Sequence, residues 1–456
     1  MSEFDDAVGW LRSLGASRIE PGHERIRALL RLLGEPHTRL RGALVVGTNG
    51  KGSTAEYARS VLTAAGHRVG SMPSPHVGDE TERIQIDGRP IASTSFVALA
   101  CRVRSAVEDL AARDVRPTMF EALVAMAYLW FDESRVDLVV AEAGMGGRDD
   151  ATSVAPFAVT AVTTVALDHT AFLGADVAQI AANKAGAIRR GGVVVIGDLP
   201  VEARREVVTR VRDVGATGIW ALRDLVRVRT GTGGGIDLDV GRLPDGAPPR
   251  TVTGLKLSSP GTHQQHNLGV AYLLVSALES ALGLQQVPER CWRAGVAATR
   301  LPARLEEIDV RTANAQRRLI VDGAHNPAAL GVVLPVLRHM VSGCAGPVRV
   351  IFGAMRDKDC RAMVAQLPSE WEVVFTSSGE VRSADPSDLA ALRGGRSCAV
   401  GDVRAALDVA LGSAGTAPVL VLGSLHVAGL VRDAVRARSA AGSTGSPSVG
   451  EWGDLP

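Results

Sequence analysis

The sequence predicts an α/β protein in which helices cover parallel β-sheets. Short apolar runs rich in β-branched residues are typical of buried strands, and they occupy residues 44–46, 138–140, 193–196, 319–321, 348–352 and 419–422. Longer stretches rich in Ala, Leu, Arg and Glu, such as 55–65, 96–112 and 120–132, favour helices. The two patterns alternate along the chain, and this alternation is typical of parallel sheets.

The chain is long enough for more than one domain. Its 456 residues, 46% of them hydrophobic, can supply two or three cores of ordinary size. Residues 229–262 are rich in Gly and Pro, which predicts an irregular β-hairpin excursion with exposed turns. Pro302 interrupts the pattern before a new series of strands, so we expect a first domain over 1–297 and a second over 298–438. Residues 439–456 are rich in Ser, Gly and Pro and are expected to be disordered.

Charge and cysteine usage exclude several classes of protein. The formal net charge is +1, which argues against a dedicated nucleic-acid binder. No apolar run approaches the roughly 20 residues of a membrane span, and the acidic N-terminus lacks the pattern of a signal peptide. The five cysteines are scattered and form no CxxC pair, as expected for free thiols in a cytoplasmic protein.

A glycine-rich loop follows the first predicted strand. Its residues, Gly47-Thr48-Asn49-Gly50-Lys51-Gly52-Ser53, precede a predicted helix, and this arrangement directs backbone N–H groups and a helix N-terminus at an anion. Lys51 can reach terminal phosphates, and Ser53 or Thr54 can offer a hydroxyl to Mg²⁺. The spacing G-x-x-G-K-G-S differs from the common G-x-x-x-x-G-K-[ST], so a plain glycine turn is the alternative, but the lysine and the hydroxyl favour a phosphate loop.

Polar clusters also follow other predicted strands, where ligands gather in open α/β sheets. They are Ser74-Pro75-His76 with Glu82-Arg83, the run Glu142–Thr152, Leu167–Thr170 with Lys184, and Asp322–Pro327. Glu142 suits Mg²⁺, whereas His169 is a less usual ligand and Asp168 could equally cap a helix. The Asp322 segment either grips a ribose or phosphate or forms an Asp-Gly turn before a helix.

Together these segments resemble the folylpolyglutamate synthase/dihydrofolate synthase family within the Mur ligase superfamily. The match runs in order over nearly the whole chain, and its most family-specific parts are the phosphate loop, the run Gly146–Thr152 and Asp322–Pro327. The resemblance implies a Mur-ligase-type P-loop ATPase domain with a parallel-rich sheet, followed by a smaller Rossmann-like α/β domain that carries the glutamate ligase part. ATP is expected to bind between the two.

The resemblance also implies roles for individual residues. Lys51, Lys184 and His169 are expected to act in catalysis, and Lys184 matches a lysine that is carbamylated in much of the superfamily. The expected Mg²⁺ ligands are Ser53, Ser74, Glu142, His169 and, if carbamylated, Lys184. The expected nucleotide-binding residues are Thr48, Asn49, Gly50, Lys51, Gly52, Ser53, Thr54, Asn267, Arg304, Asp322 and His325, with Asn267 on the adenine. The acceptor-binding residues are His76, Arg83, Phe120 and Asp150, of which the last two match residues that hold a pterin.

The implied activity is an ATP- and Mg²⁺-dependent ligase that activates a carboxylate as an acyl phosphate and joins it to L-glutamate. Dihydropteroate or a reduced folate is the expected acceptor. The loop Val77-Gly78-Asp79-Glu80-Thr81 departs from the family, as do Asp149, Ser153 and Ala303, so another carboxylic acid in a specialised pathway is the first alternative. A non-catalytic nucleotide-binding protein is the second. Only small-molecule partners are expected, with no nucleic acid and no membrane, and the protein is expected to be a monomer.

Overall fold

The computed structural model describes residues 2–15, 18–231, 234–311, 316–412 and 417–440. The chain divides into two compact units, one formed by Met1–Ser258 with Thr262–Arg300 and the other by Ser259–Gly261 with Leu301–Pro456. The predicted domain boundary between residues 297 and 298 stays a prediction. The last helix, α16 (Leu425–Ala440), runs into the predicted tail, and the rest of that tail lies outside the described residues.

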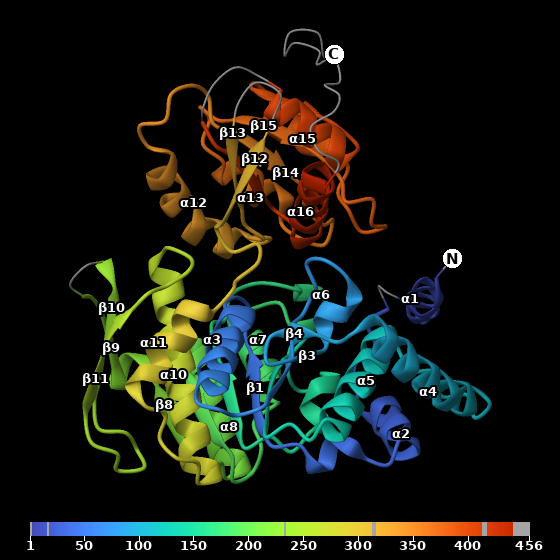
Figure 1. The fold of residues 1–456 in the computed structure, drawn as a ribbon, viewed down its shortest axis with the longest axis vertical. Coiled ribbons are helices and arrows are strands. Elements are labelled where there is room, and N and C mark those ends of the chain that lie inside the picture. The colour runs from blue at the N-terminus through green and yellow to red at the C-terminus, as the bar shows by residue number, and fades with distance from the viewer. Residues whose placement is uncertain (1, 16–17, 232–233, 312–315, 413–416, 441–456) are drawn as a thin grey trace. The chain divides into compact units, whose positions relative to one another are not determined.

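The first unit is built on a sheet that has, in the described part of the chain, eight strands in the order β4-β3-β2-β5-β1-β6-β7-β8 (Figure 1). Neighbouring strands in the part β2-β5-β1-β6-β7-β8 pair parallel. Strand β3 pairs antiparallel with both β2 and β4. The strands are β1 (Gly42–Val46), β2 (Val69–Met72), β3 (Gln85–Ile86), β4 (Arg89–Pro90), β5 (Leu138–Glu142), β6 (Val159–Val162), β7 (Val193–Ile196) and β8 (Gly218–Ala221). The predicted strands at 44–46, 138–140 and 193–196 are confirmed.

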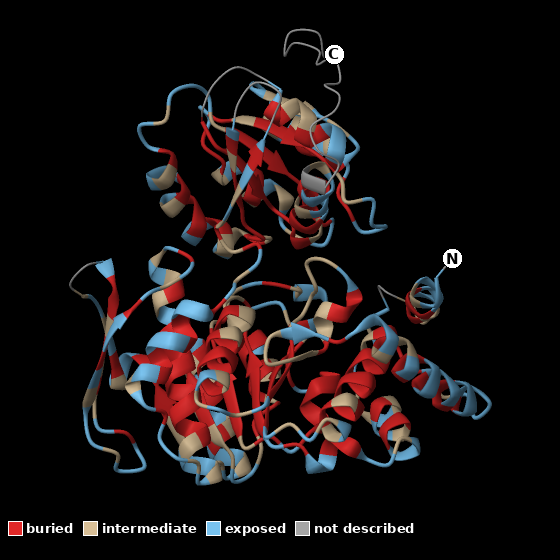
Figure 2. Ribbon diagram, viewed as in Figure 1, coloured by how far each residue is buried: buried red, intermediate tan, exposed pale blue. Residues whose placement is uncertain are grey.

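Helices cover both faces of this sheet, because alternate residues of a strand point to opposite faces. Leu44 and Val46 of β1 join a core with helices α1 (Glu3–Ser13), α2 (Glu24–Leu32), α4 (Ser93–Ala111), α5 (Met119–Glu133), α7 (Val177–Ala185) and α8 (Val201–Val214). On the opposite face lie α3 (Lys51–Ala64), α10 (Thr262–Leu282) and α11 (Glu289–Ala298). Figure 2 shows the buried strands between helices with exposed outer sides.

Short helical elements complete the first unit. They are the 3₁₀ turns η1 (Pro36–Arg39), η2 (Glu80–Arg83) and η3 (Ala151–Val154), and the four-residue helices α6 (Thr170–Leu173) and α9 (Leu222–Leu225). The helix predictions at 55–65, 96–112 and 120–132 are confirmed in type by α3, α4 and α5. No helix in the described ranges is both long enough and apolar enough to cross a bilayer, and the five cysteines are free thiols.

The segment predicted as an irregular hairpin is more regular than expected. It forms a three-stranded antiparallel sheet, in the described residues, of β9 (Val226–Thr230), β10 (Ile236–Val240) and β11 (Arg250–Leu255), in the order β11-β10-β9. Along β10 the residues Ile236, Leu238 and Val240 are buried and their neighbours are half-exposed. This alternation gives the sheet one apolar face, which packs on α10 and α11.

The second unit contains, among its described residues, a six-stranded sheet in the order β12-β13-β17-β14-β15-β16. Its strands are β12 (Glu306–Arg311), β13 (Gln316–Val321), β14 (Arg349–Phe352), β15 (Glu372–Phe375), β16 (Ser397–Ala399) and β17 (Val419–Leu422), and its other helices are α12 (Pro327–Val341), α13 (Cys360–Gln366), α14 (Pro386–Arg393) and α15 (Val403–Leu411). Among these six described strands, β12 at the edge pairs antiparallel with β13, and the other pairings are parallel. The predicted strands at 319–321, 348–352 and 419–422 are confirmed.

Strand order identifies the edge of the first sheet that suits a ligand. The chain leaves β1 through α3 for β2 on one side, while β6 pairs with β1 on the other side. In open α/β sheets, ligands bind beyond the carboxyl ends of the strands at such a switch point. A ligand-binding site is therefore expected at the loop after β1 and the carboxyl ends of β2, β5 and β6.

Candidate active site

The glycine-rich loop joins β1 directly to α3. Gly50 has a left-handed backbone (φ 82°) and precedes the first helical residue, Lys51. A Cβ on Gly50 would lie 2.4 Å from Asn267 Oδ1, so a side chain has neither the conformation nor the space it needs there. The first N–H groups of α3 have no acceptor within the helix, and these donors with the positive end of the helix dipole suit a phosphate.

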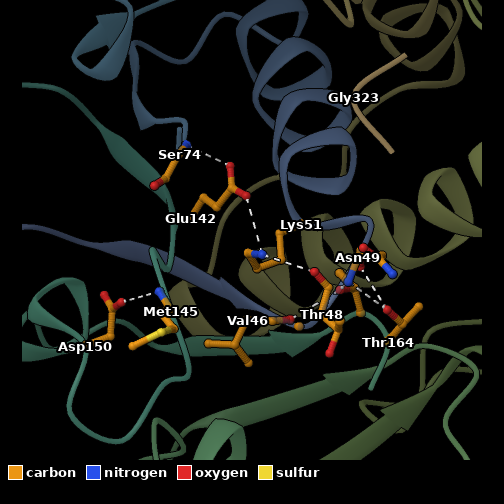
Figure 3. Close-up of polar contacts among 12 residues, drawn as sticks. Val46, Thr48, Asn49, Lys51, Ser74, Glu142, Met145, Asp150, Thr164 and Gly323 are labelled. Atoms are coloured by element: carbon orange, nitrogen blue, oxygen red, sulfur yellow. Dashed lines mark hydrogen bonds and ion pairs between the residues drawn. The ribbon is translucent and has the colours of Figure 1, made fainter. Parts of the chain in front are cut away.

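Two threonines after β6 hold this loop in place. The Thr48 N–H donates to the Thr164 carbonyl at 2.8 Å, and the Asn49 N–H donates to Thr164 Oγ1 at 3.0 Å (Figure 3). Thr163 Oγ1 donates to the Asn49 carbonyl at 2.7 Å. Sequence reasoning missed both threonines, although their position directly after an apolar run at 159–162 was a usable signal.

Glu142 lies at the centre of the candidate site. It ends β5, paired beside Val45 of β1, so the strand register brings it next to the phosphate loop. Its Oε1 lies 3.9 Å from Lys51 Nζ, and its Oε2 accepts the Ser74 N–H at 3.0 Å (Figure 3). A Cβ on Gly52 would lie 3.2 Å from Glu142 Oε2. The structure therefore brings Lys51, Ser74 and Glu142 together, as the strand-end rule predicts.

The donor atoms at this position fit Mg²⁺. In the described part of the chain, no group of three or more His, Cys, Asp or Glu side chains is arranged as a metal site. Glu142 can instead offer a carboxylate beside Ser74, and Mg²⁺ takes few protein ligands of this hard oxygen type while it keeps several waters. The hydroxyls of Ser53 and Ser74 as ligands stay a prediction. His169 precedes α6 in a left-handed conformation (φ 48°), and its role as a ligand stays a prediction.

Lys184 contacts the first residue of the phosphate loop, Gly47. It is on α7, its side chain is 2% exposed, and its Nζ donates to the Gly47 carbonyl at 2.9 Å. A buried amine with this contact fixes the end of β1 relative to α7. Carbamylation of Lys184 stays a prediction.

The run after β5 is held by Asp150. Its Oδ2 accepts the Met145 N–H and its Oδ1 accepts the Thr152 N–H, both at 2.9 Å. Burial raises the pKa of Asp150, while these hydrogen bonds act in the opposite direction. The Phe120 ring lies under Gly144, where a Cβ would be 2.6 Å from it. Phe120 and Asp150 thus flank one loop, and their role toward an acceptor stays a prediction.

His76 and Arg83 form a second pair near Ser74. Arg83 Nε donates to His76 Nδ1 at 2.8 Å, and Arg83 Nη1 lies 3.4 Å from Ser74 Oγ. Burial lowers the pKa of Arg83, while Glu80 and Glu142 oppose this shift. The two predicted acceptor-binding residues are therefore joined to each other, and Arg83 lies in the field of Glu142.

Three of the residues that depart from the family, Asp79, Glu80 and Ser153, have structural partners. Asp79 accepts the Thr81 N–H at 2.8 Å and so caps η2. Glu80 is buried and pairs with Arg12 of α1 at 2.7 Å. Ser153 Oγ lies 2.9 Å from His23 Nε2. These contacts give Asp79 and Glu80 of the acidic loop a role in local packing.

Asn267 approaches the phosphate loop from α10. Its carbonyl lies 3.5 Å from Thr54 Oγ1, and its Nδ2 donates to Gln264 Oε1 at 3.2 Å. The structure therefore places this predicted adenine contact beside Gly50, while its contact with a base stays a prediction. Gln264 was not predicted to act in the site, although it lies one turn before Asn267 on the same helix face.

In the second unit, three predicted nucleotide-binding residues gather around Gly323. Asp322 accepts the Leu305 N–H at 2.9 Å and the Ala324 N–H at 2.8 Å. His325 Nδ1 lies 2.9 Å from the Gly323 carbonyl, and a Cβ on Gly323 would be 2.8 Å from Arg304 Nη1. Burial raises the pKa of Asp322, and Arg304 opposes this shift. Their role toward a nucleotide stays a prediction.

Comparison with known proteins identifies relatives over most of the chain. Residues 303–425 match the family model described as Mur ligase, glutamate ligase domain. A folylpolyglutamate synthase of Lacticaseibacillus casei is 32% identical over 433 residues, covering 94% of this chain and 98% of the relative. A dihydrofolate synthase/folylpolyglutamate synthase of Mycobacterium tuberculosis is 34% identical over 402 residues, covering 83% of this chain and 79% of the relative.

Solved structures agree with these relatives. A Mycobacterium tuberculosis folylpolyglutamate synthase complexed with ADP aligns with a TM-score of 0.83 at 30% identity, covering 95% of this chain and 98% of that one. Escherichia coli FolC in complex with DHPP and ADP aligns with a TM-score of 0.82 at 27% identity, covering 96% of this chain and 99% of that one. The chain belongs to the folylpolyglutamate synthase/dihydrofolate synthase family of Mur ligases.

Proposed function

We propose that this protein uses ATP and Mg²⁺ to activate a carboxylic acid and to join it to the amine of L-glutamate. The observation that carries the proposal is the contact of Lys51 with Glu142, 3.9 Å apart at the start of α3. A cation for phosphate oxygens and a carboxylate for a metal meet there at a helix N-terminus. Membership of a family of ATP-dependent glutamate ligases supports the same chemistry.

In the first step, an oxygen of the substrate carboxylate attacks the γ-phosphorus of ATP, and the bond to the β,γ-bridging oxygen breaks. The products are an acyl phosphate and ADP. Lys51 and the N–H groups of Gly52 and Ser53 would bind the phosphate oxygens and stabilise their charge. Glu142, Ser53 and Ser74 would hold Mg²⁺, which would supply further positive charge.

In the second step, the glutamate amine attacks the carbonyl carbon of the acyl phosphate. A tetrahedral intermediate forms, the carbon–oxygen bond to phosphate breaks, and the nitrogen loses a proton to solvent or to a base. The protein's part is to hold the two reactants in line and to exclude water, because water would hydrolyse the acyl phosphate.

The loop after β5 supports the choice of acceptor. Phe120 offers an aromatic ring beside Gly144, and Asp150 shapes the run from Met145 to Thr152. An aromatic, hydrogen-bonding group such as a pterin suits these neighbours. We therefore infer that the acceptor is dihydropteroate, a reduced folate, or both, with ATP and L-glutamate as the other substrates. We also infer a cytoplasmic monomer, for which light scattering should give the mass of one chain.

An acceptor screen tests this function. Purified protein with ATP, Mg²⁺ and L-glutamate should release phosphate only when the right acid is added, and mass spectrometry should detect the glutamyl product. Dihydropteroate and tetrahydrofolate are the first acids to try. Release with some other acid and with neither of these would show that the folate assignment is wrong, while binding of ADP without turnover on any acid would show a non-catalytic protein.

A further inference from the structure

Two hydroxyl groups that follow β6 converge on one carbonyl of the phosphate loop. Thr163 Oγ1 donates to the Asn49 carbonyl at 2.7 Å, and Thr164 Oγ1 donates to the same oxygen at 3.0 Å (Figure 3). Thr163 Oγ1 also lies 3.3 Å from the Val46 carbonyl, but that oxygen already accepts the Thr163 N–H at 2.9 Å. The shorter contact with Asn49 is therefore the better hydrogen bond. A carbonyl oxygen has two lone pairs, and both are occupied here from the β6 side.

The N–H groups that precede this carbonyl also face β6. The Thr48 N–H donates to the Thr164 carbonyl at 2.8 Å, and the Asn49 N–H donates to Thr164 Oγ1 at 3.0 Å. A hydroxyl both donates and accepts, so Thr164 Oγ1 pairs with the N–H and with the carbonyl of Asn49. The protein itself thus occupies the N–H groups of Thr48 and Asn49. The donors that suit an anion therefore begin at Gly50 and continue into the first turn of α3.

The direction of the Asn49 carbonyl determines the direction of the next N–H. A trans peptide is planar, and its C=O and N–H bonds point to opposite sides. Because the Asn49 carbonyl points toward the two threonines, the Gly50 N–H points away from β6. In the sheet, β1 lies between β6 and β5, and β5 ends in Glu142. The Gly50 N–H is therefore directed to the side of the loop on which the candidate metal-binding carboxylate lies.

A glycine at position 50 means that the peptide before it can turn over. Such a flip changes ψ of the preceding residue and φ of the following one, and glycine accepts φ of either sign. Gly50 has φ 82° in this structure. The flipped peptide would direct the Asn49 carbonyl oxygen, which carries partial negative charge, at a phosphate and would withdraw an N–H from it. The threonine hydroxyls oppose this flip, because it would break their hydrogen bonds to that carbonyl.

We propose that Thr163 and Thr164 are positioning residues that hold the Asn49–Gly50 peptide with its N–H directed at the phosphates of ATP. Neither threonine needs to contact the nucleotide, because each acts through the Asn49 carbonyl. This inference rests on the proposed function, which makes ATP the ligand of the loop. It adds two residues from a neighbouring strand end to the phosphate site, and it names the Gly50 N–H as a donor in that site.

Paired substitutions separate the hydroxyl from the rest of the side chain. Thr164→Val removes the hydroxyl and keeps the shape, whereas Thr164→Ser keeps the hydroxyl. We expect ADP binding, measured by calorimetry, to weaken about threefold to tenfold in Thr164→Val and to stay within about twofold of wild type in Thr164→Ser, because one hydrogen bond sets the fraction of protein with the competent peptide. Thr163→Val and Thr163→Ser repeat the comparison. Equal ADP affinities in the Val and Ser variants at both positions would overturn the proposal.

Thr160→Val is the matched control, because Thr160 is a buried threonine within β6 itself. Its ADP affinity should stay within about twofold of wild type. In turnover assays of Thr164→Val, the KM for ATP should rise while the KM for the acceptor stays unchanged. A loss of ADP affinity in Thr160→Val as large as that in Thr164→Val would show a general effect of strand packing and would overturn the proposal, as would an equal rise of both KM values in Thr164→Val.

NMR of the full-length wild-type protein tests the direction of the Gly50 N–H without any substitution. Asn49-Gly50 is the only Asn-Gly pair in the sequence. Labelling asparagine with ¹³C at its carbonyl and glycine with ¹⁵N therefore gives one carbonyl-filtered amide signal, that of Gly50. Adding ADP should move its proton signal downfield, because the N–H then donates to a charged oxygen. An unmoved signal at saturating ADP would overturn the proposal, even if the Val variants fail to fold.

ADP binding keeps this test distinct from the test of ligase function, because it requires neither an acid nor turnover. If the Gly50 signal moves and the Val variants bind ADP weakly while no acid yields a glutamyl product, the ligase function is wrong and the role of the two threonines stands. If a glutamyl product forms while the Gly50 signal does not respond to ADP, the ligase function stands and the role of the threonines is wrong.

Discussion

Two carboxylates, one at the end of β5 and one in the loop after it, have partners of different kinds. Glu142 ends the strand, faces Lys51 at 3.9 Å and accepts one N–H from Ser74. Asp150, in the loop that follows, accepts the N–H groups of Met145 and Thr152 of its own loop. The two are almost equally buried, at 5% and 7% exposure. Burial alone therefore does not distinguish the two carboxylates, whereas the nearby Lys51, which follows the neighbouring strand β1, does.

The second unit contains a carboxylate with the same kind of partners as Asp150. Asp322 also follows a strand, and its two oxygens accept N–H groups of Leu305 and Ala324. Both carboxylates are buried and both shape a loop that carries predicted ligand-binding residues. We infer that Asp150 and Asp322 act mainly by holding backbone in place, while Glu142 is available to bind a metal.

The largest expected effect is the loss of Lys51. Lys51→Ala removes the cation that faces Glu142 and the phosphate loop, and kcat should fall by about a thousandfold, since one preorganised charge at a reacting phosphate is worth that much. Phosphate release and product mass measure the loss, and a thermal melt controls for folding. Wild-type turnover in Lys51→Ala would show that the loop does not bind the reacting phosphates.

A smaller effect is expected from Glu142→Gln, which keeps an oxygen for the Ser74 N–H but removes the charge. The Mg²⁺ concentration that gives half-maximal turnover should rise at least about tenfold, because a neutral amide is a poor ligand for a hard cation. A Mg²⁺ titration at fixed ATP measures this. An unchanged Mg²⁺ dependence would mean that Glu142 binds no metal.

The sequence alone predicted the elements that depend on pattern and strand order. Buried strands such as 138–140 were recognisable from their β-branched residues, and the meeting of Lys51 with Glu142 followed from strand ends that share one edge. The Arg83–His76 pair and the inward turn of Asp150 were not predictable, because each depends on how a loop folds back on itself. Spacing along the chain does not reveal such contacts.

Asp150→Asn should destabilise the protein without a change in mechanism. One carboxylate oxygen becomes an NH₂ group that meets the Met145 or Thr152 N–H, donor against donor, so an expected hydrogen bond is lost in a buried place. The free energy of unfolding should fall by about 1–3 kcal/mol, measured by urea titration. Thr152→Val, which keeps the backbone N–H, is the matched control and should cost less.

A third carboxylate, Glu279, is half-buried, and one of its oxygens accepts the Val287 N–H, so its effect should depend on pH. Burial raises its pKa from 4.5 to about 6, while the Val287 N–H and Arg250 act in the opposite direction. Glu279 has the lower pKa in the unfolded chain, so it ionises there first as pH rises. The stability that its protonated carboxyl contributes is therefore full below pH 4.5 and is lost as pH rises through about 6. Glu279→Gln should therefore be more stable than wild type by about 2 kcal/mol at pH 8 and equal to it at pH 4. The same difference in the free energy of unfolding between Glu279→Gln and wild type at pH 4 and at pH 8 would contradict the raised pKa.

The smallest effect is expected at Glu80, where the acidic loop either shapes the acceptor site or only packs. Glu80→Gln keeps an oxygen for Arg12, whose side chain is 61% exposed, so solvent screens the pair and the loss of stability should stay below about 1 kcal/mol. If Glu80 belongs with Asp150 among the carboxylates that hold structure, kcat/KM for the acceptor should stay within about twofold of wild type. A tenfold change in Glu80→Gln would instead move this residue into the acceptor site, and it would revive a non-folate acid as the substrate.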